Sequence, residues 1–592
     1  MRARCDILLS SLLLIATAGP ALAQSGTPPL QYAKQGWTEE ERQAFYTTSQ
    51  GSHMIPYAWF KALRRLDVDQ PFTGDQLQRY GYLPNEKSKL NPEGLPVGFV
   101  IDGSSSTGYL GMTCAACHTG EIEYQKDGAT QRLRIDGAPA TANFQLFLTD
   151  LTAASRATLN DNDRFQQFAR AVLGSRYSAT RVDTLKSDFG DWVKQFGSFM
   201  DKSLPASSSS SSPWGPGRLD AFGMIFNRVA GKDLGIDANI QVADAPVSYP
   251  FLWNASRQDR TQWNGGVPNG LYINAIGRNT GEVFGVFADF TPKKQILPPH
   301  FNFRNNSVNF TNLQALEEKI ATLRPPPWPF ALDQGLVDKG RVLFAQYCGS
   351  CHEEKRLPEG TWLTPVVAVG TDPRMFDNSQ RTSQTGMLAG ALSPNPPGSK
   401  LGATAPTADI LATTVVGALF DDAIPPLPRL PNPKSGVWRA VNKDIAVLFA
   451  DNEKVPSLVS LLQPSVRDDV RTHIEDRLAN MFKVPGEAHA YEARVLHGIW
   501  ATAPYLHNGS VPNLYELLLP PDKRSPSFMV GSRKFDPDKV GYVTTESPYK
   551  DGTLVVGAGA QPGNSNAGHN YPADKELTDE ERKALLEYLK QL

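Results

Sequence analysis

The pattern Cys-x-x-Cys-His occurs twice in this chain of 592 residues, once in each half. Four of the five cysteines belong to the two motifs, and the fifth, Cys5, lies near the N-terminus. Two thiols three residues apart can each bond to one vinyl group of a haem, and the histidine that follows can bind the iron. The pattern therefore predicts two covalently bound haem c groups. The predicted attachment residues and proximal ligands are Cys114, Cys117, His118, Cys348, Cys351 and His352.

Other sites also use paired cysteines. The two pairs could together form one four-cysteine zinc site, or each pair could form a redox-active disulfide of the thioredoxin type. Neither of these sites needs a histidine directly after both pairs, and the pairs lie in different halves of the chain. The haem interpretation accounts for the histidines as well as the cysteines.

The first 23 residues are typical of a signal peptide. Arg2 and Arg4 precede a short apolar run at residues 7–18, and Ala21–Ala23 matches a cleavage site before Gln24. The apolar run is too short to cross a bilayer as a helix. We therefore expect a protein of the periplasm or the extracellular space that has no membrane span.

Charge and composition restrict the partners and the fold. The 59 lysines and arginines nearly balance the 61 aspartates and glutamates, which does not favour binding to nucleic acid or to an anionic membrane surface. The 46 prolines and 49 glycines predict long irregular stretches between the regular elements.

We expect a mainly α fold with two cytochrome c-like haem domains, long loop-rich insertions and an N-terminal extension. A stiff linker, Pro-Pro-Pro-Trp-Pro at residues 325–329, would separate the two haem domains. The expected boundaries are 24–105 for the extension, 106–328 for the first haem domain, 329–592 for the second haem domain and 353–480 for an insertion within it.

Helix signals flank the second haem motif. Residues 333–347 predict a helix that runs into the motif, and the capping box Thr578-x-x-Glu581 predicts a C-terminal helix. A second capping box, at Thr38–Glu41, predicts a helix near the N-terminus. In cytochrome c folds the first and last helices cross beside the haem. The positions that fit this crossing are Gly340, Phe344 and Tyr588.

From about residue 245 to the end, the chain resembles the diheme cytochrome c peroxidase superfamily. Residues 254–265 are similar to the segment that places a tryptophan between the haems, and residues 494–514 are similar to the C-terminal peroxidase motif. A closer resemblance is to the rubber oxygenase branch, which includes periplasmic fatty-acid dioxygenases and diol synthases that act on oleate. The segments that carry this closer resemblance are 91–99, 113–119, 491–518 and 568–569.

The resemblance implies unequal roles for the two haems. A haem with two protein ligands mostly transfers electrons, whereas an open distal side can bind dioxygen or peroxide. His569 is the implied distal ligand of the second haem, and His507, otherwise a structural histidine, is the alternative. Trp263 is implied as a bridge between the haems, or else is a core aromatic. Glu282 is implied as an acid that shuttles protons, or else is a helix-surface carboxylate.

The residue before the tryptophan departs from the rubber oxygenase pattern. Gln262 stands where those enzymes have phenylalanine, and Arg257, Arg260 and Arg278 are near in sequence. A more polar pocket would suit a substrate with a carboxylate group better than a pure hydrocarbon, although each arginine could equally pair with a haem propionate. His53 is a weaker candidate for the distal side of the first haem.

The expected function is therefore oxygenation of an unsaturated, lipid-like substrate at the first haem. A fatty acid such as oleate would give a hydroperoxide or a diol, and polyisoprene would be cleaved at its double bonds. The second haem would set the redox state of the first through Trp263. The alternatives are a diheme peroxidase that reduces hydrogen peroxide and a plain electron-transfer cytochrome. Expected partners are dioxygen or a hydroperoxide, the hydrophobic substrate and, as a further candidate, a small redox donor protein.

Overall fold

The structure is a computed structural model that describes residues 28–206, 213–295, 301–358, 360–423, 435–448, 463–550, 552–557 and 560–592. The expected signal peptide and its cleavage site lie outside these residues. Within them, no helix combines the length and the apolar character that a membrane crossing requires.

The expectation of a mainly α fold is wrong. Helices make up about 40% and strands about 15% of the structure, and the strands of the described residues form ten small sheets. The long irregular stretches explain the difference, because short extended runs satisfy their backbone groups by pairing two or three residues at a time. The division into an extension and two haem domains stays a prediction.

The largest sheet follows the first Cys-x-x-Cys-His motif directly. Strand β5 (Thr119–Lys126) pairs antiparallel with β6 (Ala129–Asp136), and β1 (Leu30–Tyr32) adds to β6 in parallel. Both turn residues, Asp127 and Gly128, have positive φ, as the favoured two-residue hairpin turn requires.

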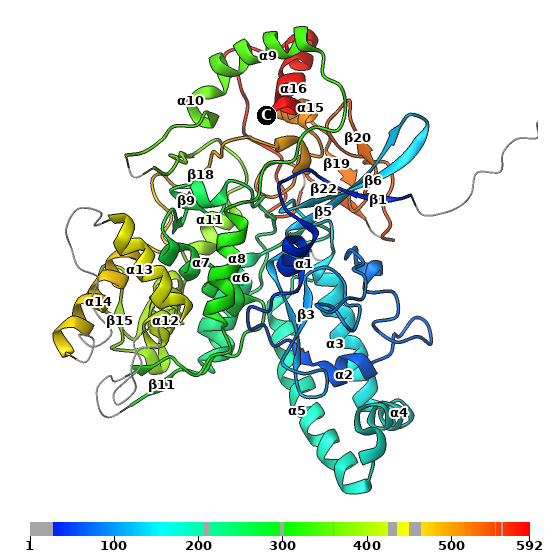
Figure 1. The fold of residues 1–592 in the computed structure, drawn as a ribbon, viewed down its shortest axis with the longest axis vertical. Helices are drawn as coiled ribbons and strands as arrows, with labels where there is room; N and C mark the ends of the chain where they lie inside the picture. The colour runs from blue at the N-terminus through cyan, green and yellow to red at the C-terminus, as the bar shows by residue number, and fades with distance from the viewer. Residues whose placement is uncertain are drawn as a thin grey trace, which may run out of the picture.

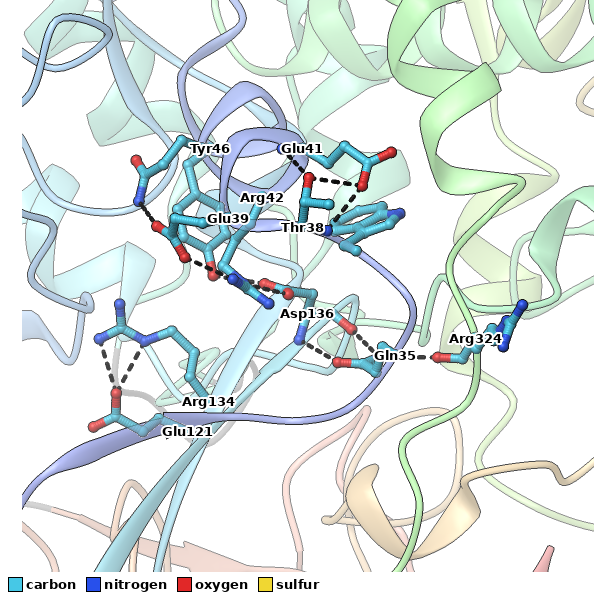
Figure 2. Close-up of polar contacts among 12 residues, drawn as sticks. Gln35, Thr38, Glu39, Glu41, Arg42, Tyr46, Glu121, Arg134, Asp136 and Arg324 are labelled. Carbon is cyan, nitrogen blue, oxygen red and sulfur yellow. Dashed lines mark hydrogen bonds and ion pairs between the residues drawn. The ribbon is translucent and has the colours of Figure 1, made fainter.

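Helix α1 (Glu39–Thr47) packs over this sheet and is held by a buried polar network. The expected capping box is confirmed, since Thr38 and Glu41 bond each other's backbone N–H groups. Figure 2 shows Arg42 and Tyr46 of α1 pointing at Asp136, to which they donate hydrogen bonds of 2.8 and 2.5 Å. Because β6 ends at Asp136 and the Gly137 N–H donates to the His118 carbonyl, this network anchors the haem motif.

A helical arm extends from the N-terminal region, as Figure 1 shows. It consists of α3 (Phe144–Asn160), α4 (Asn162–Leu173) and α5 (Ala179–Ser203). Its base packs on α2 (Tyr57–Ala62) and on the sheet of β2 (Ile55–Pro56), β4 (Tyr109–Met112) and β3 (Phe99–Asp102).

The centre of the molecule is a helical core that carries several candidate site residues. It contains α6 (Ala221–Phe226), a π-helical turn at Asn227–Asp233, α7 (Tyr272–Gly285) and α8 (Phe310–Ile320). Helices α12 (Thr407–Ala423), α13 (Gly436–Leu448) and α14 (Pro464–Arg477) cover one side of it (Figure 1). Helix α12 is buried almost throughout, so the expected insertion contributes much of the core.

The expected helix crossing of the second half is confirmed. Helix α9 (Gln334–Tyr347) runs into Cys348 and crosses α16 (Asp579–Gln591) near the C-terminus (Figure 1). The rings of Phe344 and Tyr588 lie 5.3 Å apart. A side chain at Gly340 would meet the Ala584 carbonyl oxygen at 2.0 Å, so the two backbones approach closely there.

The remaining elements are short and lie mostly in the loop-rich stretches. The helices are α10 (Gly349–His352), α11 (Arg374–Ser379) and α15 (Leu514–Leu517). The strands are β7 (Arg218–Leu219), β8 (Val247–Ser248), β9 (Arg260–Thr261), β10 (Val267–Pro268), β11 (Lys293–Lys294), β12 (Phe301–Asn302), β13 (Val366–Val367), β14 (Thr382–Gln384), β15 (Leu392–Ser393), β16 (Ser399–Lys400), β17 (Thr404–Pro406), β18 (Tyr491–Glu492), β19 (Ser527–Met529), β20 (Phe535–Asp536), β21 (Gly541–Tyr542) and β22 (Thr553–Val555).

Candidate functional site

The first motif forms a short 3-10 turn (Cys114–Ala116) between β4 and β5, and its side chains line a large cavity. The Thr113 hydroxyl accepts a hydrogen bond from the Ala115 N–H and so begins the turn. The space around the motif amounts to about 1340 Å³, including its opening to solvent. Its walls are mostly apolar and include Phe222, Ile225 and Val247.

His118 is held in the form that binds a metal. Its Nδ1–H donates to the Pro250 carbonyl at 2.8 Å, because a carbonyl oxygen can only accept. This leaves Nε2 as the nitrogen available to a metal, the usual arrangement for a histidine ligand. Burial lowers the pKa of His118 to about 4, so the ring is neutral at neutral pH, as metal binding requires.

His352 of the second motif has the same arrangement. Its Nδ1–H donates to the Arg494 carbonyl at 2.8 Å, and burial lowers its pKa. The ring lines a second cavity, which also contains His569 and His507. In both motifs an imidazole whose pKa is lowered lines a cavity and accompanies two free thiols. The thiols of the first motif also line its cavity, and this donor set fits covalently attached haem. The zinc alternative lacks support, since no three Cys, His, Asp or Glu of the described residues come together as a metal site.

His569 faces His352 across the second cavity. The two ring centroids lie 6.2 Å apart. Two imidazoles that bind one metal atom from opposite sides, each at a metal–nitrogen distance of about 2 Å, have centroids roughly 6 Å apart. Two hydrogen bonds hold the backbone of His569. The His569 N–H donates to the Val369 carbonyl, and the His569 carbonyl accepts from the Arg524 side chain. Burial, with His352 and Arg524 nearby, lowers the pKa of His569 to about 3.

His507 lines the same cavity with a different ring partner. Its ring stacks on Tyr491 at a centroid distance of 4.0 Å, and its carbonyl accepts a hydrogen bond from the Ser248 N–H. Which of the two histidines binds the second haem stays a prediction, and the ring geometry favours His569.

Glu282 and Gln262 meet at the wall of the first cavity. Glu282 lies on α7, and its carboxylate accepts a hydrogen bond of 2.9 Å from the Gln262 side chain. Burial raises the pKa of Glu282 above its usual range, an effect that Arg278 opposes. Gln262 has a positive φ of 69°, a conformation that residues other than glycine seldom adopt. The neighbouring residues of α7 are buried, whereas Glu282 is partly exposed and lines the first cavity.

Trp263 forms part of the wall between the two cavities, because it lines both. Its indole N–H donates to the Ser248 carbonyl at 2.7 Å, and its own carbonyl accepts from the Glu492 N–H at 2.7 Å. The position suits a residue between two haems, and its role as a bridge stays a prediction.

The other candidates from the sequence, three arginines and His53, have contacts of their own, and they do not form one site. Of the three arginines, Arg278 lines the first cavity, and each of its three side-chain nitrogens donates a hydrogen bond, to Glu317 or to a neighbouring asparagine side chain. Arg257 lies over the Trp362 ring, and Arg260 donates to a backbone carbonyl. Both ring nitrogens of His53 are engaged by carboxylates, which leaves neither free for an iron.

The sequence analysis missed Glu492 and Arg494, which line both cavities. They lie in the segment 491–518, which carries the resemblance to rubber oxygenases, and this position could have marked them as candidate site residues. Their contacts with residues far away in the chain could not be foreseen.

Comparison with known proteins supports part of this interpretation. Residues 490–529 match the family described as RoxA-like, cytochrome c-like. This match supports the resemblance to rubber oxygenases and implies haem c and a haem-dependent oxidoreductase activity. The diheme peroxidase superfamily, the fatty-acid branch and the number of haems stay predictions.

Two relatives come from Sinorhizobium fredii (strain NBRC 101917 / NGR234). The uncharacterized protein y4iJ is 29% identical over 95% of this chain and 93% of its own length. The uncharacterized protein y4iM is 24% identical over 58% of this chain and 63% of its own length. The first of these similarities extends well beyond the matched cytochrome segment.

Proposed function

We propose that this chain is an exported c-type cytochrome with two haems that oxygenates an unsaturated, lipid-like substrate. The first haem, attached at Cys114 and Cys117, would be the catalytic one, and the second would transfer electrons. The observation that carries this proposal is the difference between the two cavities. His352 faces a second histidine at 6.2 Å, whereas the lining residues described around His118 include no other histidine and instead contain Glu282 and Gln262.

The haem would supply the activation of dioxygen, and the protein would supply binding, orientation and protons. The apolar walls of the first cavity would hold a hydrocarbon chain and exclude water. The buried carboxyl of Glu282, whose pKa is raised, would donate or accept a proton at the wall of this cavity. Gln262 would orient that carboxyl through its hydrogen bond.

The arginine geometry bears on the substrate. Arg278 is neutralised by Glu317 at 2.5 Å, and its Nε and Nη1 atoms each donate a hydrogen bond to an asparagine side chain. It is therefore a poor anchor for a substrate carboxylate. We propose that the unsaturated hydrocarbon portion of the substrate enters the cavity. Both oleate and polyisoprene have such a portion.

The test is product analysis with labelled dioxygen. The purified holoprotein is incubated with oleate, oleate hydroperoxide or polyisoprene latex under ¹⁸O-labelled dioxygen and, in a separate arm, with hydrogen peroxide, a reduced cytochrome and the lipid. The products are identified by mass spectrometry and the oxidation of the cytochrome is followed by absorbance. Labelled hydroperoxide, diol or cleavage products support the proposal. If only the incubation with oleate hydroperoxide gives a diol, the reaction is an isomerisation. Turnover only with hydrogen peroxide and a reduced cytochrome would refute it.

A diheme peroxidase is the second candidate, because Trp263 between the cavities and Glu282 beside the first haem motif would also serve peroxide reduction. The same incubations distinguish the two, since a peroxidase consumes the reduced donor and leaves the lipid unchanged.

A further inference from the structure

Glu492 and Arg494 form a buried polar site between the two cavities. Glu492 ends β18, Arg494 follows two residues later, and both line the first and the second cavity. Their relative exposures are 9% and 5%. Charged side chains are seldom buried to this extent unless they are paired.

The pairing within this site is incomplete. Arg494 donates through Nε and Nη2 to the Gln258 side chain at 3.0 and 2.5 Å, and its Nε lies 3.4 Å from Glu492 Oε1. The Arg494 Nη1 and the Glu492 Oε2 are buried without a hydrogen-bond partner. Leaving charged groups unsatisfied in the interior is costly. These two atoms therefore indicate that the cavities hold a polar or charged group when the protein is complete, and a haem carboxylate is suitable for Nη1.

The site is linked to both haem motifs through the backbone. The Arg494 carbonyl holds the His352 ring, and the Glu492 N–H donates to the Trp263 carbonyl. The Trp263 indole in turn donates to Ser248, two residues before the carbonyl of Pro250 that holds His118. Because Glu492 is buried at the wall of both cavities, a change of charge at either haem would be screened less at this carboxylate than at a surface group.

The balance of charges around Glu492 leaves it close to titration. Arg494 and Arg278 favour its carboxylate, Asp259 opposes it, and burial has the largest effect, so that its pKa rises to about 7. An added electron nearby disfavours the carboxylate further.

We propose that Glu492 is a redox-linked proton site shared by the two haems, positioned by Arg494. A haem held at Cys114 and Cys117 or at Cys348 and Cys351 would accept one electron from a small redox donor protein, and the Glu492 carboxylate would take up one proton from solvent. The reverse step releases both. The inference rests on the proposed presence of haem in both cavities and does not depend on the lipid substrate.

The test is a spectroelectrochemical titration of the holoprotein between pH 5.5 and 8.5, with haem content determined separately. In the wild type, the midpoint potential of at least one haem should fall with rising pH by up to about 59 mV per pH unit, the value of a tenfold change for a one-electron couple. In Glu492→Gln this slope should disappear. Asp421→Asn is the matched control, because Asp421 is also buried with a pKa raised to about 6 but lines neither cavity, and it should keep the slope.

Two results would overturn the proposal. One is a wild-type protein in which the midpoint potentials of both haems do not change with pH. This result does not depend on any variant. The other is an unchanged slope in Glu492→Gln, as a titrating haem propionate would produce. If Glu492→Gln does not fold or load haem, Glu492→Asp replaces it and should keep a slope with a shifted pH range. A protein without two haems would refute the proposed function as well, whereas absence of lipid oxygenation would leave this inference intact.

Discussion

Gly340 allows α9 and α16 to cross closely, and this crossing positions the second haem motif because α9 runs directly into Cys348. A Cβ atom at residue 340 would lie 2.0 Å from the Ala584 carbonyl oxygen and 2.8 Å from the Tyr588 Cβ. A rotation of a side chain cannot relieve this overlap, since the nearest atoms belong to the backbone. In Gly340→Ala the two helices must therefore move apart.

The expected cost follows from the geometry. Non-bonded atoms need about 3.5 Å, so the overlap amounts to roughly 1.5 Å. Alanine stabilises a helix by about 1 kcal/mol relative to glycine, whereas overpacking of this kind costs about 1–3 kcal/mol or more. Because the overlap is with backbone atoms, we take the upper end of this cost, about 3 kcal/mol. After the gain of about 1 kcal/mol from alanine, Gly340→Ala should lower the free energy of unfolding by about 2 kcal/mol. The matched control is Gly335→Ala on the same helix, where the nearest atom lies at 3.3 Å and a change within about 0.5 kcal/mol is expected.

The assay is denaturant unfolding of both variants and the wild type, followed by circular dichroism and by haem absorbance. Because α9 runs directly into Cys348, the haem signal should be lost at lower denaturant in Gly340→Ala than in Gly335→Ala. Equal midpoints for the two variants would show that the helices are not packed backbone to backbone, and the argument from the crossing would fail.

Three further predictions concern histidines and an acid. His569→Ala should abolish the low-spin absorption spectrum of one haem and His507→Ala should not; the reverse result would make His507 the ligand. His53 bridges two carboxylates, which raise its pKa to about 9 although burial acts in the opposite direction. Its contribution is complete below about pH 6.5 and is lost as the pH rises through 9. Because the Asp289 carboxylate is largely exposed, solvent screens the pair, and the unfolding free energy should fall by about 1 kcal/mol across this range relative to His53→Gln, as denaturant titrations would show. Glu282→Gln should lower kcat for lipid oxygenation by about 10²–10⁴-fold with normal haem content; unchanged turnover would remove Glu282 from the reaction.

Local sequence signals predicted local structure well. The capping boxes at Thr38 and Thr578, the helix before Cys348 and the crossing at Gly340 all depend on residues close in sequence or on a steric demand that only glycine meets. The hairpin after His118 could have been predicted too, since Asp127-Gly128 between extended runs is a strong turn signal. The haem motifs and the capping boxes predict helices only beside them, and extending that prediction to the whole chain overestimated its helix content.

The polar contacts of the site could not be read from local patterns. The sequence makes Arg278 a candidate partner for a carboxylate, but the fold places Glu317 of α8 against it at 2.5 Å. The same holds for Arg494, whose Gln258 partner lies far away in the chain. Such pairs depend on how distant segments pack. The type of a residue shows only that it could take part in a polar site, and not which partner it has.

The hydrogen bonds of the two proposed proximal histidines constrain how Trp263 can be tested. His118 and His352 are each held by a carbonyl from outside their own motif, and Trp263 is hydrogen-bonded to both of the segments that supply these carbonyls. Trp263→Phe would remove the indole between the cavities and also the hydrogen bond to Ser248. A slower electron transfer in this variant therefore supports bridging only if the ferric spectra of both haems are unchanged, because altered spectra would mean that the histidines themselves had moved.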